Sequence, residues 1–280
     1  MSARTGSGET PNYFASLLAL TGQSLAQLVR TPSHARRAEA ARRWARQTWL
    51  TVAVVGAVIV ALMYGFDARE IGMMPSRGTP GLGLVRILTD LGKDSYVLLL
   101  LAGMLLVVAL VAAAQAGTAR ARWLGLGLRL QFVFFAVLTP LLAGELIKWA
   151  AGRGRPFVGG KADPFNFEPF IGTESHASFP SAHCITAFAL AVAVAAVWPR
   201  ARGAMLVYAV LIAVSRLVLL AHHPSDEVAG ATIGVVGAMA VRYWFAARRL
   251  GFAIHRDGEI MPLRRVFGGL KRVAGKALAP

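Results

Sequence analysis

SYVLLLLAGMLLVVALVAAAQA, residues 95–116, is an apolar run without a charged side chain. A helix of about 20 such residues crosses the hydrocarbon core of a bilayer, because each residue adds about 1.5 Å to its length. Five further apolar runs lie at residues 49–66, 123–147, 182–198, 203–221 and 227–247. Only residues 199–202 separate the fourth run from the fifth, which predicts a tight helical hairpin. The sequence therefore predicts an all-α fold, a polytopic membrane bundle of six transmembrane helices.

The composition agrees with a membrane protein, since 56% of the residues are hydrophobic and only 16% are charged. The net charge of +16 would suggest nucleic acid as a partner in a soluble protein. Here the basic residues gather at the ends of apolar runs, where an anionic lipid surface at the cytoplasmic face explains them. We therefore expect no nucleic-acid partner. Cys184 is the only cysteine, which excludes an intramolecular disulfide and a cysteine-based metal cluster within the chain.

Basic residues also predict the orientation, because Lys and Arg in short flanking segments tend to remain cytoplasmic. They occur before the first run at Arg36, Arg37, Arg42, Arg43 and Arg46, and after the last at Arg248, Arg249, Arg264, Arg265, Lys271, Arg272 and Lys276. We expect both termini to be cytoplasmic and, in a bacterium, the protein to lie in the inner membrane. Three parts are predicted: a basic, amphipathic N-terminal segment at 1–48, the six-helix membrane domain at 49–247 and a basic cytoplasmic tail at 248–280.

One connection, residues 148–181, breaks this rule, because it holds four basic residues although the alternation of spans places it outside. Either these charges are kept to bind an anion, or Lys148 simply extends its charge to the membrane edge beside a solvated loop. This feature alone does not decide between the two explanations.

Polar side chains gather in three clusters: KWAAGRGRP at 148–156, PSAH at 180–183 and SRLVLLAHHPSD at 215–226. The six-span arrangement places all three clusters at the outer face of the membrane, opposite the cytoplasm, so they can form one site. The candidate residues are the cations Lys148, Arg155 and Arg216, the hydroxyl of Ser181, the imidazoles of His183, His222 and His223, and the carboxylate of Asp226. Cations around a small space favour the binding of an anion, and phosphate is the natural candidate. Backbone N–H groups at the start of a helix near Ser181 would add hydrogen-bond donors for it.

Imidazoles beside a phosphate indicate chemistry, because a neutral histidine can attack phosphorus while a protonated one serves the leaving oxygen. Asp226 stands four residues after His222, a spacing that can bring the carboxylate beside the ring. Each cluster also has a purely structural explanation. Arg216 and Asp226 can form a buried ion pair, Ser181 can merely cap a helix, and single histidines are common at membrane edges. The convergence of all three clusters on one face favours one site.

With these residues the sequence resembles the type 2 phosphatidic acid phosphatase superfamily. Its signatures K-x6-RP, PSGH and SR-x5-H-x3-D are met by Lys148, Arg155 and Pro156, by Pro180, Ser181, Ala182 and His183, and by Ser215, Arg216, His222 and Asp226. The resemblance implies a helical bundle that needs no metal or other cofactor. It implies that Lys148, Arg155, Ser181, Arg216 and the N–H of Ala182 bind phosphate. It also implies that His222, rather than His223, forms a phosphohistidine, that Asp226 orients it, and that His183 is the acid and base. Ala182 replaces the usual Gly, so we expect altered affinity or substrate shape.

The resemblance therefore predicts a membrane phosphatase for a lipid monoester or diphosphate, such as undecaprenyl diphosphate, phosphatidylglycerol phosphate, phosphatidic acid or a lipid A phosphate. Transfer of the phosphoryl group to another lipid would use the same residues. A catalytically idle lipid-binding relative is a third possibility, and the presence of both His183 and His222 opposes it. Vanadium haloperoxidases share the pocket but are soluble. A metal site at His176, Glu174, His183 and His222 lacks a supporting ligand spacing. The sequence gives no oligomeric state.

Overall fold

The computed structural model of the chain describes residues 13–31, 34–76, 79–161, 163–255 and 259–263. Its helices are α1 (Tyr13–Val29), α2 (His34–Gly65), α3 (Asp67–Met73), α4 (Gly83–Asp90), α5 (Asp94–Ala114), α6 (Gly117–Ala151), α7 (Ala182–Val197), α8 (Arg202–Val218) and α9 (Pro224–Ala247). Short 3-10 turns lie at Val158–Gly160, Glu174–His176 and Pro199–Ala201, and the strands β1 (Phe252–Ile254) and β2 (Ile260–Pro262) pair in antiparallel fashion.

Each of the six apolar runs forms a helix, namely α2 and α5 to α9. Within the described part of the chain, five helices are long and apolar enough to cross a membrane. The exception is α7, which has 16 residues and whose neighbours α6, α8 and α9 all pack against it. A helix enclosed by other helices does not need to match the thickness of the bilayer by itself. The prediction of an all-α polytopic membrane bundle is confirmed, and so is the hairpin of α7 and α8.

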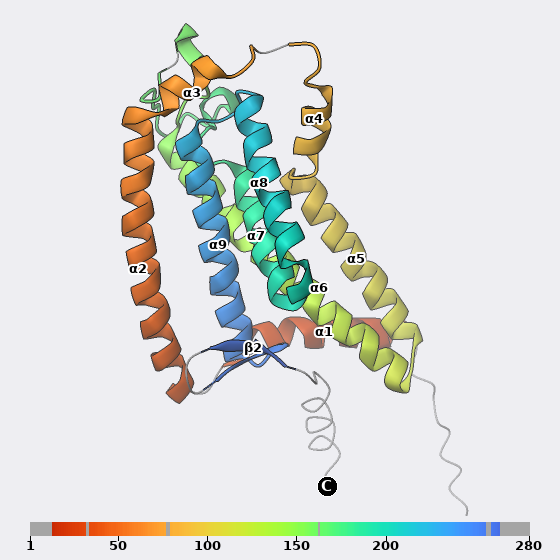
Figure 1. The fold of residues 1–280 in the computed structure, drawn as a ribbon. Helices are drawn as coiled ribbons and strands as arrows, with labels where there is room; N and C mark the ends of the chain where they lie inside the picture. Colours follow the sequence, from red (N-terminus) through yellow and green to blue (C-terminus); the bar gives the residue numbers. More distant parts are fainter. Residues whose placement is uncertain (1–12, 32–33, 77–78, 162, 256–258, 264–280) are drawn as a thin grey trace, which may run out of the picture.

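The two ends of the bundle differ (Figure 1). At one end lie α3, α4 and the long connection from α6 to α7. At the other end α1 lies crosswise to the long helices, near the β1–β2 hairpin. The helix α1 is joined to the bundle by hydrogen bonds from Tyr13 Oη to the Leu110 carbonyl oxygen, at 3.2 Å, and from Trp244 Nε1 to the Leu28 carbonyl oxygen, also at 3.2 Å. This arrangement fits a helix that lies in the membrane interface.

The division of the chain at residues 48 and 248 stays a prediction. The helix α2 begins at His34 and runs without a break through the first of these positions, so the N-terminal segment and the first span share one helix. After α9, the described part of the tail folds back as the β1–β2 hairpin, which no pattern in the sequence indicated. The basic residues from Arg264 to Lys276 lie outside the described residues.

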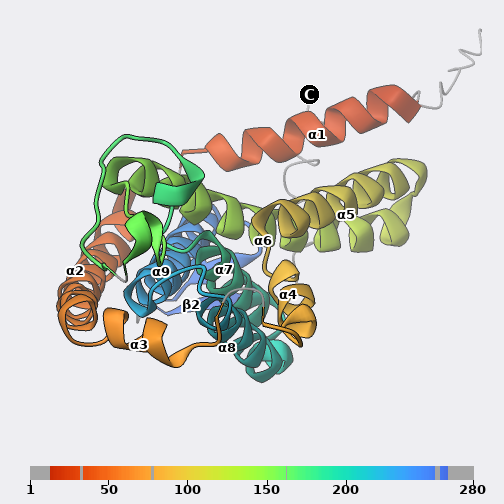
Figure 2. The ribbon, with the colours of Figure 1, turned by 90° about the horizontal axis from the view of Figure 1, so that it is seen from above.

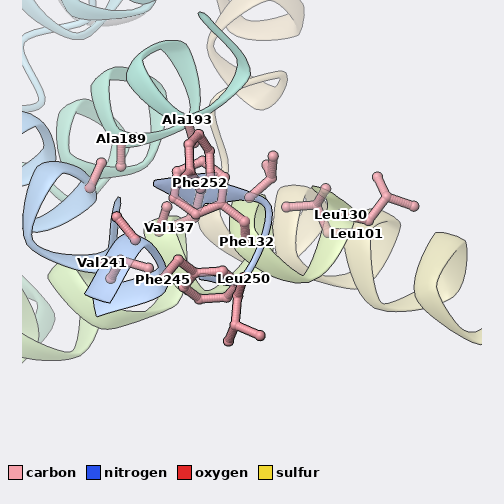
Figure 3. Packing of buried hydrophobic residues seen from close by; sticks show 14 of the residues in the cluster. Leu101, Leu130, Phe132, Val137, Ala189, Ala193, Val241, Phe245, Leu250 and Phe252 are labelled. Carbon is pink, nitrogen blue, oxygen red and sulfur yellow. The ribbon is translucent and has the colours of Figure 1, made fainter. Parts of the chain in front are cut away.

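The main hydrophobic core joins α5, α6, α7 and α9 to β1 (Figure 3). The ring of Phe132 on α6 packs against Phe245 of α9, with ring centres 5.4 Å apart, and against Phe252 of β1, at 4.7 Å. Both contacts are edge-to-face, the arrangement that aromatic pairs favour. Burial of Phe252 in this core explains why the chain turns back against the bundle after its last helix.

Glycines allow α7 and α9 to approach each other backbone to backbone. A side chain on Gly230 would place its Cβ 2.5 Å from the Ser181 carbonyl oxygen, and one on Gly234 would lie 2.5 Å from the Ile185 carbonyl oxygen. Small residues permit such close crossings of membrane helices. The result is a direct backbone hydrogen bond from Ser181 N to the Asp226 carbonyl oxygen, 3.2 Å long, which joins the first turns of the two helices.

Gly234→Ala should therefore destabilise the protein by about 1–3 kcal/mol, because the added methyl group forces the two helices apart. The matched control is Gly103→Ala on α5, where an added Cβ meets nothing within 4 Å. Thermal unfolding in detergent, followed by tryptophan fluorescence, should show a lower midpoint for Gly234→Ala and an unchanged or slightly raised one for Gly103→Ala. Equal midpoints for the two variants would contradict the close crossing of α7 and α9.

Candidate active site

The site begins where α6 ends. Gly152 closes the helix with a positive φ of 56°, and a side chain there would overlap the Glu168 carbonyl oxygen. The Gly152 carbonyl oxygen accepts a 2.8 Å hydrogen bond from Glu168 N, so the turn is fixed on both sides. This turn leaves Lys148 on the last turn of α6, paired with Glu145, and directs Arg153 into the protein interior.

Positive charges surround His183, in the first turn of α7. The three predicted phosphate-binding cations, Arg216, Arg155 and Lys148, are all close enough to act electrostatically on its ring. Lys93 adds a fourth charge that the motifs do not indicate. The structure thus brings together residues from α6, the connection after it, α7 and α8. Repulsion among these charges favours an anion between them.

Two of these cations, Arg155 and Arg216, can still bind an anion. Arg155 donates from Nε to the Glu174 carbonyl oxygen at 2.9 Å and forms a 3.3 Å ion pair with the same residue's carboxylate, which is 96% exposed. Arg216 donates from Nη1 to Thr89 Oγ1, at 3.4 Å. Its Nε is buried and has no hydrogen-bond partner among the described residues. An unpaired buried donor is costly, and an anion in the pocket would satisfy it.

The start of α7 supplies backbone donors. Ser181 is fully buried and caps the helix, since its hydroxyl accepts a 3.4 Å hydrogen bond from Cys184 N. Ala182 is the first helical residue, and its φ does not lie in the left-handed region that requires glycine. Alanine therefore fits this position without backbone strain.

His222 lies between α8 and α9. Its Nδ1 is 2.8 Å from the Ser178 carbonyl oxygen and 3.9 Å from Asp226 Oδ2. Because a carbonyl oxygen can only accept, Nδ1 carries the proton and the neutral ring has its lone pair on Nε2. Burial, and then the charge of Arg216, hold the pKa of His222 well below its ordinary value. The ring is thus held in its neutral form, and the carbonyl of Ser178, rather than the expected carboxylate, fixes its tautomer.

His223 occupies a different place from its neighbour. It is fully buried and is the N-cap residue before α9, where Asp226 Oδ2 accepts a 2.8 Å hydrogen bond from its backbone N and a 3.2 Å contact from its Nδ1. The other ring nitrogen, Nε2, is buried without a hydrogen-bond partner in the described ranges. Its backbone and ring therefore support the carboxylate at the helix start.

The carboxylate of Asp226 is fully buried and accepts from several donors. Arg153 Nη1 lies 2.6 Å from Oδ1, and Ser178 Oγ donates to Oδ2 at 2.6 Å. The ion pair of this carboxylate is thus formed with Arg153 and not with Arg216, which was the structural alternative. Arg153 and Ser178 are not among the residues that the motifs indicate. Arg153 stands in the same basic segment as Arg155, but the spacing of the first signature selects only the latter.

Glu227 is a further buried polar residue that the motifs do not indicate. It follows Asp226 on α9, and the Cys184 thiol donates to its carboxylate. Its Oε1 is buried without a hydrogen-bond partner in the part of the chain that the structure describes. The one signal for it in the sequence is its charge, since an acidic residue at the start of a membrane span is costly unless it has a role.

The alternative metal site is not assembled. Glu174 pairs with Arg155, and His176 Nε2 lies 3.3 Å from Glu168 Oε1. Across the described ranges, no group of three or more His, Cys, Asp or Glu side chains is arranged to hold a metal ion.

Residues 129–250 match the family model of the PAP2 superfamily. A lipid A 1-phosphatase of Rhizobium johnstonii is 35% identical over 136 residues, which cover 49% of this chain and 54% of that protein. A lipid A 1-phosphatase of Rhizobium etli is 32% identical over 151 residues, which cover 54% and 62%.

The match thus spans little more than half the length of these two relatives. No solved structure matches the chain at a significant level. PAP2 is the type 2 phosphatidic acid phosphatase superfamily that the three signatures indicate. All residues of those signatures, from Lys148 to Asp226, lie inside the matched segment and at one end of the bundle, so residues 129–250 of this chain are similar to the PAP2 superfamily in sequence and in its signatures.

Proposed function

We propose that this protein is a membrane lipid phosphatase that removes a phosphate monoester through a phosphohistidine on His222. One observation carries the proposal. A histidine whose tautomer leaves Nε2 as a nucleophile lies beside Arg155 and Arg216, cations that also act on a second histidine, His183. Nucleophile, anion-binding groups and proton donor are the parts that phosphoryl transfer through a covalent intermediate requires.

For the substrate we propose the 1-phosphate of lipid A or a closely related glycolipid. The names of the two relatives support this choice, although the match covers only part of each. Exposed aromatic side chains at the same end of the protein support a lipid substrate in general. They include Trp149 and Phe170, whose rings lie 4.8 Å apart, and Phe157 and Phe165. Aromatic side chains are favoured where hydrocarbon meets headgroups, the depth of a lipid phosphate.

In the first step, the lone pair of His222 Nε2 attacks phosphorus and forms the N–P bond. The bond between phosphorus and the leaving oxygen breaks, and its electron pair goes to that oxygen, which takes a proton from His183. The guanidinium groups of Arg155 and Arg216 and the ammonium of Lys148 stabilise the charge on the other phosphate oxygens. The negative charge of a bound phosphate balances the charge of these cations, and so favours a protonated His183 beside them.

In the second step, water attacks the phosphohistidine. A new O–P bond forms, His183 takes a proton from the water, and the N–P bond breaks with its electron pair returning to Nε2. Inorganic phosphate leaves, and His183 is again a proton donor. The hydrogen bond from Nδ1 of His222 to the Ser178 carbonyl oxygen persists through both steps, so the ring keeps its orientation.

The test is phosphate release from lipid A, phosphatidylglycerol phosphate, phosphatidic acid and undecaprenyl diphosphate by the protein in detergent, with and without EDTA. Mass spectrometry of the lipid A product identifies which phosphate is lost, and His222→Ala serves as the blank. We expect loss of the 1-phosphate, unchanged by EDTA and absent from the blank. Activity abolished by EDTA would contradict the metal-free mechanism. Preference for another lipid would overturn the substrate, and no release from any lipid would overturn the phosphatase itself.

A further inference from the structure

Arg153 is a fully enclosed cation beside the site, with 0% of its side chain exposed. It pairs with two carboxylates, through Nη2 to Asp67 Oδ2 at 2.8 Å and through Nη1 to Asp226 Oδ1 at 2.6 Å. Its remaining donors reach Ser225 Oγ at 2.6 Å and the Pro164 carbonyl oxygen at 2.9 Å. Four of the five guanidinium N–H donors are thus bonded to protein groups, and its charge is paired with two carboxylates and is not free for phosphate.

Asp67 comes from outside the segment that matches the PAP2 family. It is the first residue of α3, the short helix that contacts the ends of α2 and α9 (Figure 2). Its side chain is fully buried. Its Oδ1 accepts a 3.1 Å hydrogen bond from Ser225 N, and the Ser225 hydroxyl donates to Oδ2. The N-terminal part of the chain therefore completes the first turn of α9, next to Asp226.

The number of charges in this cluster matters more than any single contact. One guanidinium paired with Asp226 alone would form a neutral pair, and the nearby His222 would sense little negative charge. With Asp67 sharing the same guanidinium, the three groups carry a net charge of −1. The nearest part of that charge, Asp226 Oδ2, lies 3.9 Å from His222 Nδ1. A negative charge at this distance stabilises a ring that becomes positive, and it does so strongly where water is excluded.

His222 becomes positive during the proposed reaction, because it keeps the proton on Nδ1 while Nε2 bonds to phosphorus. We propose that Asp67 and Arg153 are positioning residues that set the charge of Asp226: Arg153 holds the carboxylate in place, and Asp67 offsets Arg153 so that one negative charge remains for the phosphorylated His222. This inference rests on the proposed function and deepens it. It also gives the N-terminal part of the chain a role in the chemistry.

Three variants separate charge balance from mere packing. Asp67→Asn keeps the shape but makes the cluster neutral. Arg153→Gln leaves two carboxylates without a cation, and this variant alone risks misfolding. The double variant Asp67→Asn with Arg153→Gln restores the net charge of −1 with neutral amides in both places. Asp94→Asn, at the start of α5, is the control for loss of one acidic charge at the same end of the bundle. Thermal unfolding shows which variants are folded.

For Asp67→Asn we expect kcat for phosphate release to fall by about 10- to 100-fold, with KM changed less than about threefold. The double variant should regain at least about tenfold in kcat over Asp67→Asn, and Asp94→Asn should match the wild type. If Asp67 and Arg153 had only a structural role, the order of kcat would be reversed, and the double variant would have the lowest kcat. Wild-type kcat in Asp67→Asn, or no gain in the folded double variant, would overturn the proposal.

A second measurement does not depend on lipid turnover. Modification of His222 by diethylpyrocarbonate, followed by peptide mass spectrometry across pH, reports when its ring becomes neutral. The other charged groups that act on this ring are Arg216 on α8, Arg155 after α6 and Asp226 on α9, and none changes in these variants. The pH at which half of His222 is modified should fall by about one unit in Asp67→Asn. It should return to the wild-type value in the double variant. If the midpoints shift while the wild type hydrolyses no lipid, the charge balance stands and the phosphatase assignment fails. Unshifted midpoints in an active enzyme overturn the charge balance alone.

Discussion

His222→Gln should lower the rate of lipid phosphate release by a factor on the order of 10⁴ or more, whereas His223→Gln should lower it less than about tenfold. Both changes replace an imidazole by an amide of similar size at adjacent positions. The expected difference arises from what each ring nitrogen contacts. His222 presents an unprotonated Nε2 because its Nδ1 donates to the Ser178 carbonyl oxygen at 2.8 Å, and glutamine cannot provide a nucleophilic nitrogen in that place.

The ring of His223 instead supports Asp226 through a 3.2 Å contact that a glutamine amide can reproduce, and the 2.8 Å hydrogen bond from its backbone N is unaffected by the side chain. The measurement is kcat with lipid A in mixed micelles, together with trapping of ³²P-labelled protein by rapid acid-free quenching. Label should be absent in His222→Gln and present in His223→Gln. Label retained in His222→Gln and lost in His223→Gln would assign the nucleophile to the other histidine.

Arg216→Ala should lower kcat/KM by about 10³-fold, the second largest loss that the geometry predicts. Arg216 acts electrostatically on both His183 and His222, and its buried Nε lacks a hydrogen-bond partner among the described residues. A phosphate oxygen would satisfy that donor, so the guanidinium would hold the phosphate beside both imidazoles. Arg216→Lys keeps the charge but loses the planar fork, and we expect it to recover only about tenfold of the loss.

Arg86→Ala is the control, because Arg86 is an exposed guanidinium on α4 at the same end of the bundle. It should leave kcat/KM within about twofold of the wild type. Equal losses for Arg86→Ala and Arg216→Ala would mean that the general positive potential of this end attracts the substrate, and that no specific contact is made by Arg216. Thermal unfolding of each variant separates loss of binding from loss of the fold.

The helices could be predicted from the sequence because the signal is local. A run such as residues 95–116 has no alternative to a membrane helix, since each backbone group in hydrocarbon must find a partner within the same segment. Alternation of spans then placed the three polar clusters at one end, where the structure brings Lys148, Arg155, Arg216 and His183 together. The β1–β2 hairpin could not be foreseen, because its two three-residue strands are shorter than any reliable periodicity and are fixed by Phe252 in the core.

What the sequence by itself determined was the membrane bundle, the resemblance to the PAP2 superfamily and the residues of the three signatures, because these follow from apolar length and from spacing within short segments. What only the tertiary structure decided was how those residues are held. The partner of Asp226 is Arg153, and the partner of His222 Nδ1 is a backbone carbonyl. Asp67 contacts Ser225 across 158 positions of the chain. Contacts across such a separation depend on how helices pack, and no spacing in the sequence encodes them directly.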